Sequence, residues 1–120
     1  MIQAVESPLE PPYTIAIATK LFCSFADQTR LAIITVLAGG EQRVTDIVET
    51  LGASQANISG HLKCLRECGV VIDRRSGREA FYRIAHPEVI DVLRSAERLL
   101  EITGTRIELC PNYLPQSSAS

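Results

Sequence analysis

The sequence lacks the features that would place it in a membrane or in the secretory pathway. No apolar run reaches the roughly 20 residues of a membrane-spanning helix, and the start MIQAVESPLEPPY has no basic-then-apolar signal pattern. We therefore expect a cytoplasmic protein with reduced thiols and no membrane partner. In that compartment, four cysteines favour metal or redox chemistry over a disulfide framework.

Residues for catalysis are also scarce. The chain has only two histidines, Cys23 has no recognisable base nearby in the sequence, and no glycine-rich phosphate-binding loop is present. These absences make an enzyme the least favoured class of protein.

The chain has no overall excess of basic residues, because its formal net charge is −2. The charge is distributed unevenly, however. Residues 60–83 contain six basic and three acidic side chains, whereas residues 84–120 contain three basic and five acidic ones. This distribution fits a protein that presents one side only to phosphate.

A length of 120 residues indicates one domain, and a chain this small is often completed by dimerisation. We expect a flexible arm over residues 1–13, a folded domain over 14–103 and a C-terminal tail over 104–120. Within the domain, apolar spacing predicts helices over residues 14–25, 28–38, 44–51 and 54–69. The first of these helices has so many apolar residues that we expect it to have little exposed face.

The fourth helix is the stretch SQANISGHLKCLRECG, with Ser54 as the expected N-cap and Gly69 as the stop. A tight turn at Gly52-Ala53 joins it to the short helix before it, which is the pattern of a helix-turn-helix. Two apolar strand-like runs follow, joined at Ser76-Gly77, and predict a hairpin. A hairpin directly after such a helix is a wing. The predicted fold is therefore α+β, mainly α: a winged helix-turn-helix with long N- and C-terminal helices that form a dimer interface.

The polar side chains of the fourth helix are candidates for contact with DNA, because short amides and hydroxyls suit base edges and phosphates. Three arginines at the expected wing tip are candidates for phosphate contact, although they also fit a hairpin that needs only to stay soluble. His61 has either a packing or a phosphate-contacting role. The candidate DNA-binding residues are Ser54, Gln55, Asn57, Ser59, His61, Lys63, Arg74, Arg75 and Arg78.

The last helix is expected from His86-Pro87 to about residue 103, with apolar residues at alternating spacings of three and four. Such a stripe lies either on its own domain or against a second copy. Because the first helix offers Ile15 and Leu21 as well, we favour a two-fold homodimer.

The cysteines suggest a thiolate metal site. Cys64 and Cys68 are four positions apart, so they share a helix face and can bind one ion. Cys110, in the polar tail, is the best candidate for a third ligand, and an all-sulfur site prefers soft metal ions. The alternative is that Cys64 and Cys68 are small buried hydrophobic residues. Cys23 lies in the apolar run LFCSFA, so we expect it in the core and keep it only as a possible fourth sulfur.

Three runs, FADQTRLAIITVLAGG, VTDIVETLGASQANISGHLKCLRECGVV and RRSGREAFYRI, together resemble the ArsR/SmtB family of winged-helix metal-sensing repressors. The run HLKCLRECG followed by a tail cysteine resembles the CmtR-type cadmium and lead sensors in that family. The resemblance implies that Cys64 and Cys68 are the helix ligands and that Cys110 is the tail ligand. In those sensors the tail cysteine comes from across the dimer; for Cys110, its own subunit and the partner subunit are both left open. It further implies a homodimer that binds double-stranded operator DNA without metal, with Gln55 and Ser59 reading bases.

Other subtypes of the family fit less well. Sensors with a Cys-x-Cys motif at the third helix would need cysteines near Arg43 and Thr45, and zinc-type sites would need a later histidine on the last helix. Cadmium or lead is therefore the expected effector, with zinc and trivalent arsenic left open. A repressor with a thiol-redox switch and a metal-buffering protein without an operator are the alternative functions.

Overall fold

The computed structural model describes residues 13–109, in which five helices surround a small antiparallel sheet. Cys110 and most of the expected N-terminal arm and C-terminal tail lie outside the described residues. The elements in chain order are α1 (Tyr13–Ala26), α2 (Gln28–Ala38), β1 (Gln42–Arg43), α3 (Val44–Leu51), α4 (Gln55–Glu67), β2 (Val71–Ser76), β3 (Glu79–Ile84) and α5 (Pro87–Ile102).

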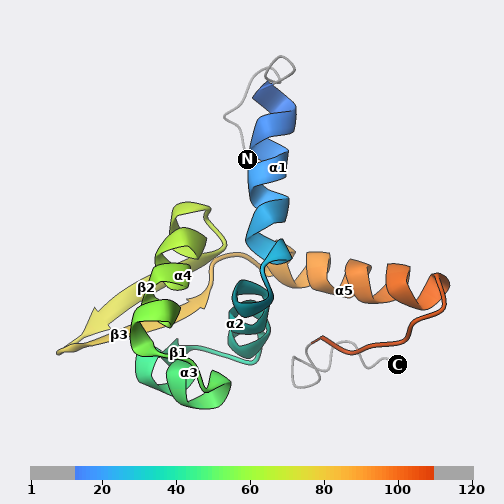
Figure 1. Cartoon of the computed structure of the whole chain (residues 1–120). Coiled ribbons are helices and arrows are strands. Elements are labelled where there is room, and N and C mark those ends of the chain that lie inside the picture. Colours follow the sequence, from blue (N-terminus) through green and yellow to red (C-terminus); the bar gives the residue numbers. More distant parts are fainter. Residues whose placement is uncertain (1–12, 110–120) are drawn as a thin grey trace.

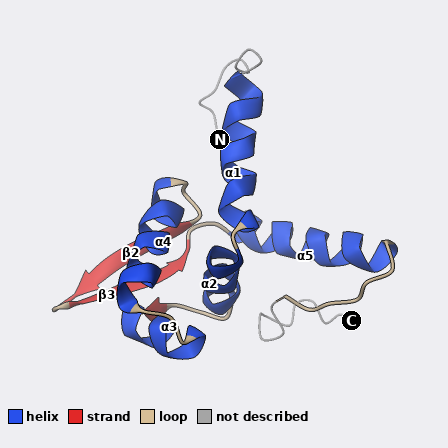
Figure 2. Cartoon of the chain, viewed as in Figure 1, coloured by secondary structure: helices blue, strands red, loops and turns tan. Residues whose placement is uncertain are grey.

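This element order confirms the predicted winged helix-turn-helix. Helices α3 and α4 form the helix-turn-helix, and strands β2 and β3 form the wing (Figure 1). The strand order is β1-β3-β2, so β3 is central and β1 adds a short third strand to the hairpin. The end of the hairpin extends beyond the helices (Figure 2).

A single apolar core holds α2, α4, the sheet and the start of α5 together. Its members share nearly complete burial and come from the apolar stripes of the helices and from one face of the sheet. The core comprises Ile33, Ile34, Leu37, Ile47, Ile58, Leu62, Leu65, Val70, Val71, Tyr82, Val89 and Leu93.

Local signals define the ends of α2 and α4. The carboxylate of Asp27 accepts a hydrogen bond from the backbone N–H of Arg30 at 3.0 Å, and Ser54 Oγ accepts one from the N–H of Asn57 at 3.1 Å. Both are N-caps, as predicted. After α4, Gly69 has φ of 79°, a left-handed conformation that lets the chain leave the helix toward β2.

Helices α1 and α5 project away from the rest of the chain in two different directions (Figure 1). As a result, α1 does not have the small exposed face that its composition predicted. Ile15 and Phe22 are each 64% exposed, and Leu99 on α5 is 62% exposed. The prediction of a small exposed face fails for the single chain, because only the C-terminal end of α1 packs against the core. Ser24 is buried at that end.

The sheet differs from the predicted hairpin in two respects. Strand β1 was not predicted, because it is only two residues long and has no apolar alternation. The turn also lies one residue later, at Gly77 and Arg78, since Ser76 pairs with Glu79. Arg78 is therefore in the turn, whereas Arg74 and Arg75 lie on β2.

Between residues 13 and 109, no helix is by itself long and apolar enough to cross a membrane. Helices α1 and α2 reach the required length and composition only when taken together, and they are bent by 79° at their junction.

The N-cap of α4 gives a test of the fold. Replacing Ser54 with Ala removes the oxygen that accepts from the N–H of Asn57, so the free energy of unfolding should fall by about 1 kcal/mol. Urea unfolding at a fixed chain concentration measures this change. Ser54→Asp retains a cap and should unfold close to wild type; equal stability of the Ala and Asp variants would contradict the capping role.

Candidate nucleic-acid interface and thiolate pair

Helix α4 presents different chemistry on either side of its buried stripe. Ile58, Leu62 and Leu65 are 0% exposed and fix the rotation of the helix about its axis. At about 100° per residue, Gln55 and Ser59 lie on one side of this stripe. The other side of the stripe carries an amide, an imidazole and two thiols, those of Asn57, His61, Cys64 and Cys68.

A groove of about 400 Å³ runs between α4 and the wing. Gln55 and Ser59 line it from α4, and Arg75 and Arg78 line it from the wing. Arg43 and Arg66 line it too, so amide and hydroxyl groups lie on the same concave surface as four guanidinium groups, together with the carboxylates of Asp73 and Glu79. This combination suits contact with base edges and phosphates at once. Asn57 is exposed but does not line this groove.

Several cations of the interface remain available for phosphate. Lys63, Arg75 and Arg78 are exposed, and none of the three forms an ion pair with any residue between 13 and 109. Arg66, in contrast, lies 3.3 Å from the Asp73 carboxylate on β2. That ion pair connects α4 to the wing across the groove.

Arg74 also has a carboxylate partner. Its Nη2 and Nε donate to the two Glu41 carboxylate oxygens at 2.8 and 2.9 Å, and its guanidinium lies 4.6 Å from the centroid of the Phe81 ring. The hydrogen bonds from Arg74 lower the pKa of Glu41 below its usual value. Two of the five N–H donors and one face of this guanidinium are therefore engaged within the chain.

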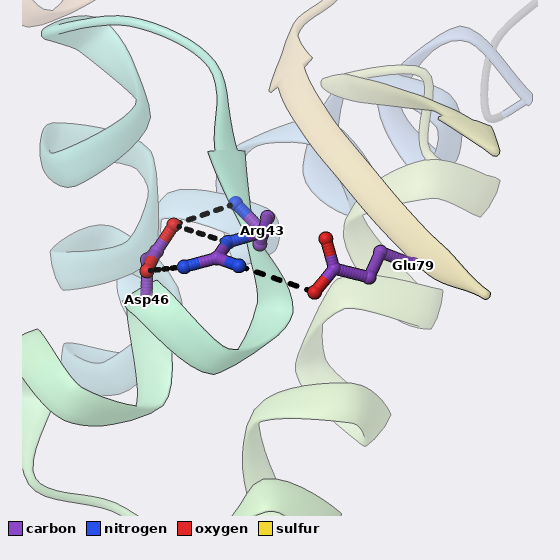
Figure 3. Close-up of polar contacts among 3 residues, drawn as sticks. All are labelled: Arg43, Asp46 and Glu79. Carbon is purple, nitrogen blue, oxygen red and sulfur yellow. Dashed lines mark hydrogen bonds and ion pairs between the residues drawn. The ribbon is translucent and has the colours of Figure 1, made fainter. Parts of the chain in front are cut away.

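A second arginine, Arg43, connects the start of α3 to the wing (Figure 3). Its guanidinium donates to the two Asp46 carboxylate oxygens at 3.0 and 2.9 Å, and to Glu79 Oε2 at 3.1 Å. These hydrogen bonds lower the pKa of Asp46 and raise that of Arg43. The sequence did not predict this cluster. The three-residue spacing of Arg43 and Asp46 at a helix start could have indicated their ion pair, but Glu79 is 36 residues away from Arg43.

His61 lies toward the N-terminal end of α2 and does not line the groove. Its Nδ1 is 3.5 Å from Arg30 Nη1, and its Nε2 is 3.8 Å from Asp27 Oδ2. Arg30 in turn donates to the backbone carbonyl of Cys23 at 2.9 Å, at the end of α1. His61 thus belongs to a polar contact between α1, α2 and α4.

Cys64 and Cys68 are one helical turn apart and half-buried, as the spacing predicted. The Cys68 backbone N–H donates to the Cys64 carbonyl at 3.0 Å, and Cys68 is the C-cap residue of α4. Cys68 also packs against the core and lines an apolar cavity of about 260 Å³ beside α1 and α5. Among residues 13–109, no group of three or more His, Cys, Asp or Glu side chains could hold a metal ion.

The other two cysteines lie elsewhere. Cys23 is exposed, which corrects the expectation that it belongs to the core; Ser24 occupies the buried position instead. Cys110 falls outside the described residues. The segment before it runs back along α5, and the Leu109 N–H donates to the Glu97 carboxylate at 2.7 Å. Cys68, in contrast, lies beside Glu88 and Val92 near the start of α5.

The chain is similar to known proteins in sequence and in structure. The sequence pattern of "Bacterial regulatory protein, arsR family" matches residues 27–73. The "Probable mercury resistance operon repressor" of Streptomyces lividans is 33% identical over 109 residues, which span 91% of this chain and 85% of that protein. The "Arsenical resistance operon repressor" of Escherichia coli is 43% identical over 67 residues, 55% of this chain and 57% of that protein.

Two further matches bear on subtype and assembly. The "HTH-type transcriptional regulator CmtR" of Mycobacterium bovis is 37% identical over 66 residues, 55% of this chain and 56% of that protein. The solution structure of a homodimeric winged helix-turn-helix DNA-binding domain, also from Mycobacterium bovis, superposes with a TM-score of 0.69 at 26% identity. That superposition covers 87% of this chain and all of the other.

The N-cap of α2 predicts a pH dependence. The backbone N–H of Arg30 lowers the pKa of Asp27 below its ordinary 3.8, so the charged carboxylate stabilises the fold above pH 3.8. This stabilisation is lost as the pH falls through the lower folded-state pKa. Asp27→Asn should therefore be less stable than wild type at pH 7, and the difference should shrink below about pH 4.

Urea unfolding of both proteins at pH 7 and pH 3 measures this difference. Glu49→Gln is the control, because Glu49 is exposed and forms no ion pair in the described part of the chain. A difference that is the same at both pH values would rule out the ionised Asp27 cap as its source.

Proposed function

The chain belongs to the arsR family of bacterial regulatory proteins, and from this premise we propose that it is a homodimeric repressor released from its operator by a soft metal ion. It is a winged-helix transcription regulator and not an enzyme. The observation that carries the proposal is the position of Cys64 and Cys68 on α4. This helix presents Gln55 and Ser59 to the groove on the other side of its buried stripe.

In the proposed complex, the N-terminal end of α4 enters the major groove of double-stranded DNA. Gln55 and Ser59 read base edges there, with Ser54 and Asn57 as neighbouring contacts, because amide and hydroxyl groups bond to bases and phosphates. Lys63, Arg75 and Arg78 bind phosphate, since none of them has an ion-pair partner within residues 13–109. His61 and Arg74 were predicted as contacts too, but each already has partners within the chain.

The proposed homodimer forms through α1 and α5. Both helices project from the core and carry large exposed apolar side chains, including Ile15 and Phe22 on α1 and Leu99 on α5. A second copy packed on these helices would remove this apolar surface from water. A two-fold dimer binds two half-sites separated by about one helical turn of DNA, roughly 34 Å. The related winged-helix domain from Mycobacterium bovis is a homodimer.

The proposed effector site consists of Cys64, Cys68 and Cys110. Two half-buried thiols on one helix face suit a soft ion, since thiolates prefer such ions to calcium or magnesium. Cadmium or lead is our first choice, as in CmtR-type sensors, with zinc and trivalent arsenic also compatible. Mercury(II) is added because a relative is a probable mercury resistance operon repressor. Leu109 is bonded to Glu97, whereas Cys68 lies near the start of the same helix, so we propose that Cys110 comes from the partner subunit.

Metal capture would tie the tail of one subunit to the reading helix of the other. The ion would thereby favour a dimer geometry in which the two α4 helices fit the operator less well. A coupling of about 1–3 kcal/mol corresponds to a roughly 5- to 150-fold loss of DNA affinity. One alternative is a repressor in which the same cysteines, Cys64, Cys68 and Cys110, respond to oxidation in place of metal.

The first test uses a duplex selected by this protein from a random pool, with binding followed by fluorescence anisotropy at fixed salt. Saturating cadmium should weaken binding about 5- to 150-fold. Cys64→Ser, Cys68→Ser and Cys110→Ser should each retain metal-free affinity and lose the cadmium response. Parallel titrations with lead, zinc, mercury(II) and arsenite identify the preferred ion.

Cys23→Ser is the matched control for this test, since its exposed thiol lies on α1 and outside the proposed site. It should respond to cadmium like wild type. Unchanged operator affinity in cadmium would contradict metal sensing. Release by mild oxidant without metal, abolished in Cys64→Ser, Cys68→Ser or Cys110→Ser, would favour the redox alternative. An absence of salt-dependent DNA binding would favour a metal buffer.

A second test asks which subunit supplies the tail ligand. Heterodimers are formed between a Cys64→Ser/Cys68→Ser chain and a Cys110→Ser chain. If the tail crosses to the partner subunit, each heterodimer contains one complete site and should show about half the wild-type ultraviolet thiolate-to-cadmium absorption, while both mutant homodimers show little. Absorption no stronger than in the mutant homodimers would place Cys110 and the helix cysteines of one chain in the same site.

A further inference from the structure

We propose that five charged residues form a wing clamp that fixes the position of the hairpin for DNA binding, and that Arg74 is one of these positioning residues and not a phosphate contact. The wing clamp comprises Glu41, Arg43, Asp46, Arg74 and Glu79. This inference rests on the proposed DNA-binding function, and it concerns residues for which that function alone gives no role.

The backbone gives the wing little support of its own. Strand β1 pairs with β3 only through Gln42 with Tyr82 and Arg43 with Phe81. The hairpin continues beyond these pairs to the pair of Ser76 with Glu79, and it extends past the helices (Figure 2). Two-stranded ribbons are marginally stable by themselves. Side-chain contacts are therefore expected to fix the end of the hairpin, in addition to the Arg66–Asp73 ion pair that joins its base to α4.

Side chains from residues 41–43 supply this support at two points. Glu41 accepts two hydrogen bonds from Arg74 on β2, and Arg43 donates one to Glu79 at the start of β3. Each strand of the hairpin is thus held by an ion pair from the same short segment. Asp46 fixes the Arg43 guanidinium through two further hydrogen bonds, which ties the clamp to the first turn of α3 (Figure 3).

The direction of the Arg74 side chain separates it from the phosphate-binding arginines. Successive side chains of a strand point to opposite faces, and Arg75 is the one that lines the groove beside α4. Arg74 stacks on Phe81, its cross-strand partner, on the other face. A bidentate bond to a carboxylate and an aromatic stack use both the planarity and the charge of the guanidinium.

The clamp also explains two acidic residues that lie near a DNA-binding surface. On charge alone, Glu41 and Glu79 would repel phosphate, so neutralising either should tighten DNA binding. If they position the wing, neutralising either should weaken binding. The two accounts therefore predict opposite signs for the same substitution.

The test measures affinity for the selected duplex over a series of salt concentrations, using the full-length dimer without metal. Glu41→Gln and Glu79→Gln should each bind about two- to fivefold more weakly, the range expected from losing one exposed ion pair. Arg74→Ala and Arg74→Lys should both weaken binding without changing the salt slope, whereas Arg75→Ala and Arg78→Ala should each lower that slope by about 1.

Glu67→Gln is the matched control, because Glu67 is exposed on α4 and has no ion pair within the described residues. It should bind as tightly as wild type or more tightly. The proposal is overturned if Glu41→Gln and Glu79→Gln behave like this control. It is also overturned if Arg74→Ala lowers the salt slope by about 1 while Arg74→Lys restores it.

A measurement without DNA keeps the clamp testable if the proposed function fails. In that event wild type shows no salt-dependent binding to any duplex, and the clamp is assessed from backbone ¹⁵N order parameters of residues 75–80. Glu41→Gln should lower these values toward those of flexible chain, below about 0.6, and Glu67→Gln should not. Wild-type order parameters in Glu41→Gln would refute the clamp.

Discussion

The burial of one stripe on α4 is the constraint on which the other features of this molecule depend. Ile58, Leu62 and Leu65 have no exposed surface, and together they lock the helix against α2, α3 and the sheet. A rotation about the helix axis would expose part of this stripe. Full exposure of each of these side chains would cost about 1.5–3 kcal/mol of folding free energy. Because rotation is prevented, the groove residues and the cysteines keep their places on opposite sides of the stripe.

This arrangement makes α4 the natural point of coupling between metal and DNA. Its first turn lies in the groove that faces the wing, and its last turn ends at Cys68, beside α1 and α5. A metal ion bound by Cys64 and Cys68 would therefore act on α4, the helix proposed to enter the DNA. It would do so close to α1 and α5, the helices proposed to form the dimer. Coupling needs only a small change in how two such helices are spaced, because the operator has a fixed half-site separation. The wing clamp adds a second constraint, which keeps the hairpin arginines in register with α4.

Features determined by neighbouring residues could be predicted from the sequence, and features determined by distant ones could not. The caps at Asp27 and Ser54 and the stop at Gly69 follow from local chemistry, and all three are present. The pairing of Glu41 with Arg74 spans 33 residues and depends on the register of a sheet whose first strand is too short to detect. Cys23 was misplaced because an apolar run such as LFCSFA does not reveal which of its residues faces the core. The placement of Cys64 and Cys68 on one helix face follows from their spacing, whereas Cys110 lies outside the described residues and its role as a ligand stays a prediction.

The central claim is that soft-metal binding and operator binding oppose each other through α4. Coupling free energies are reciprocal, so DNA must weaken metal binding by the same factor by which metal weakens DNA binding. The direct measurement is the cadmium dissociation constant of the dimer, obtained with a competing chelator, in the presence and absence of saturating selected duplex. We predict that the duplex raises this constant by the factor found for DNA release, and that a scrambled duplex of equal length raises it less. An identical cadmium dissociation constant with and without the selected duplex would contradict the account.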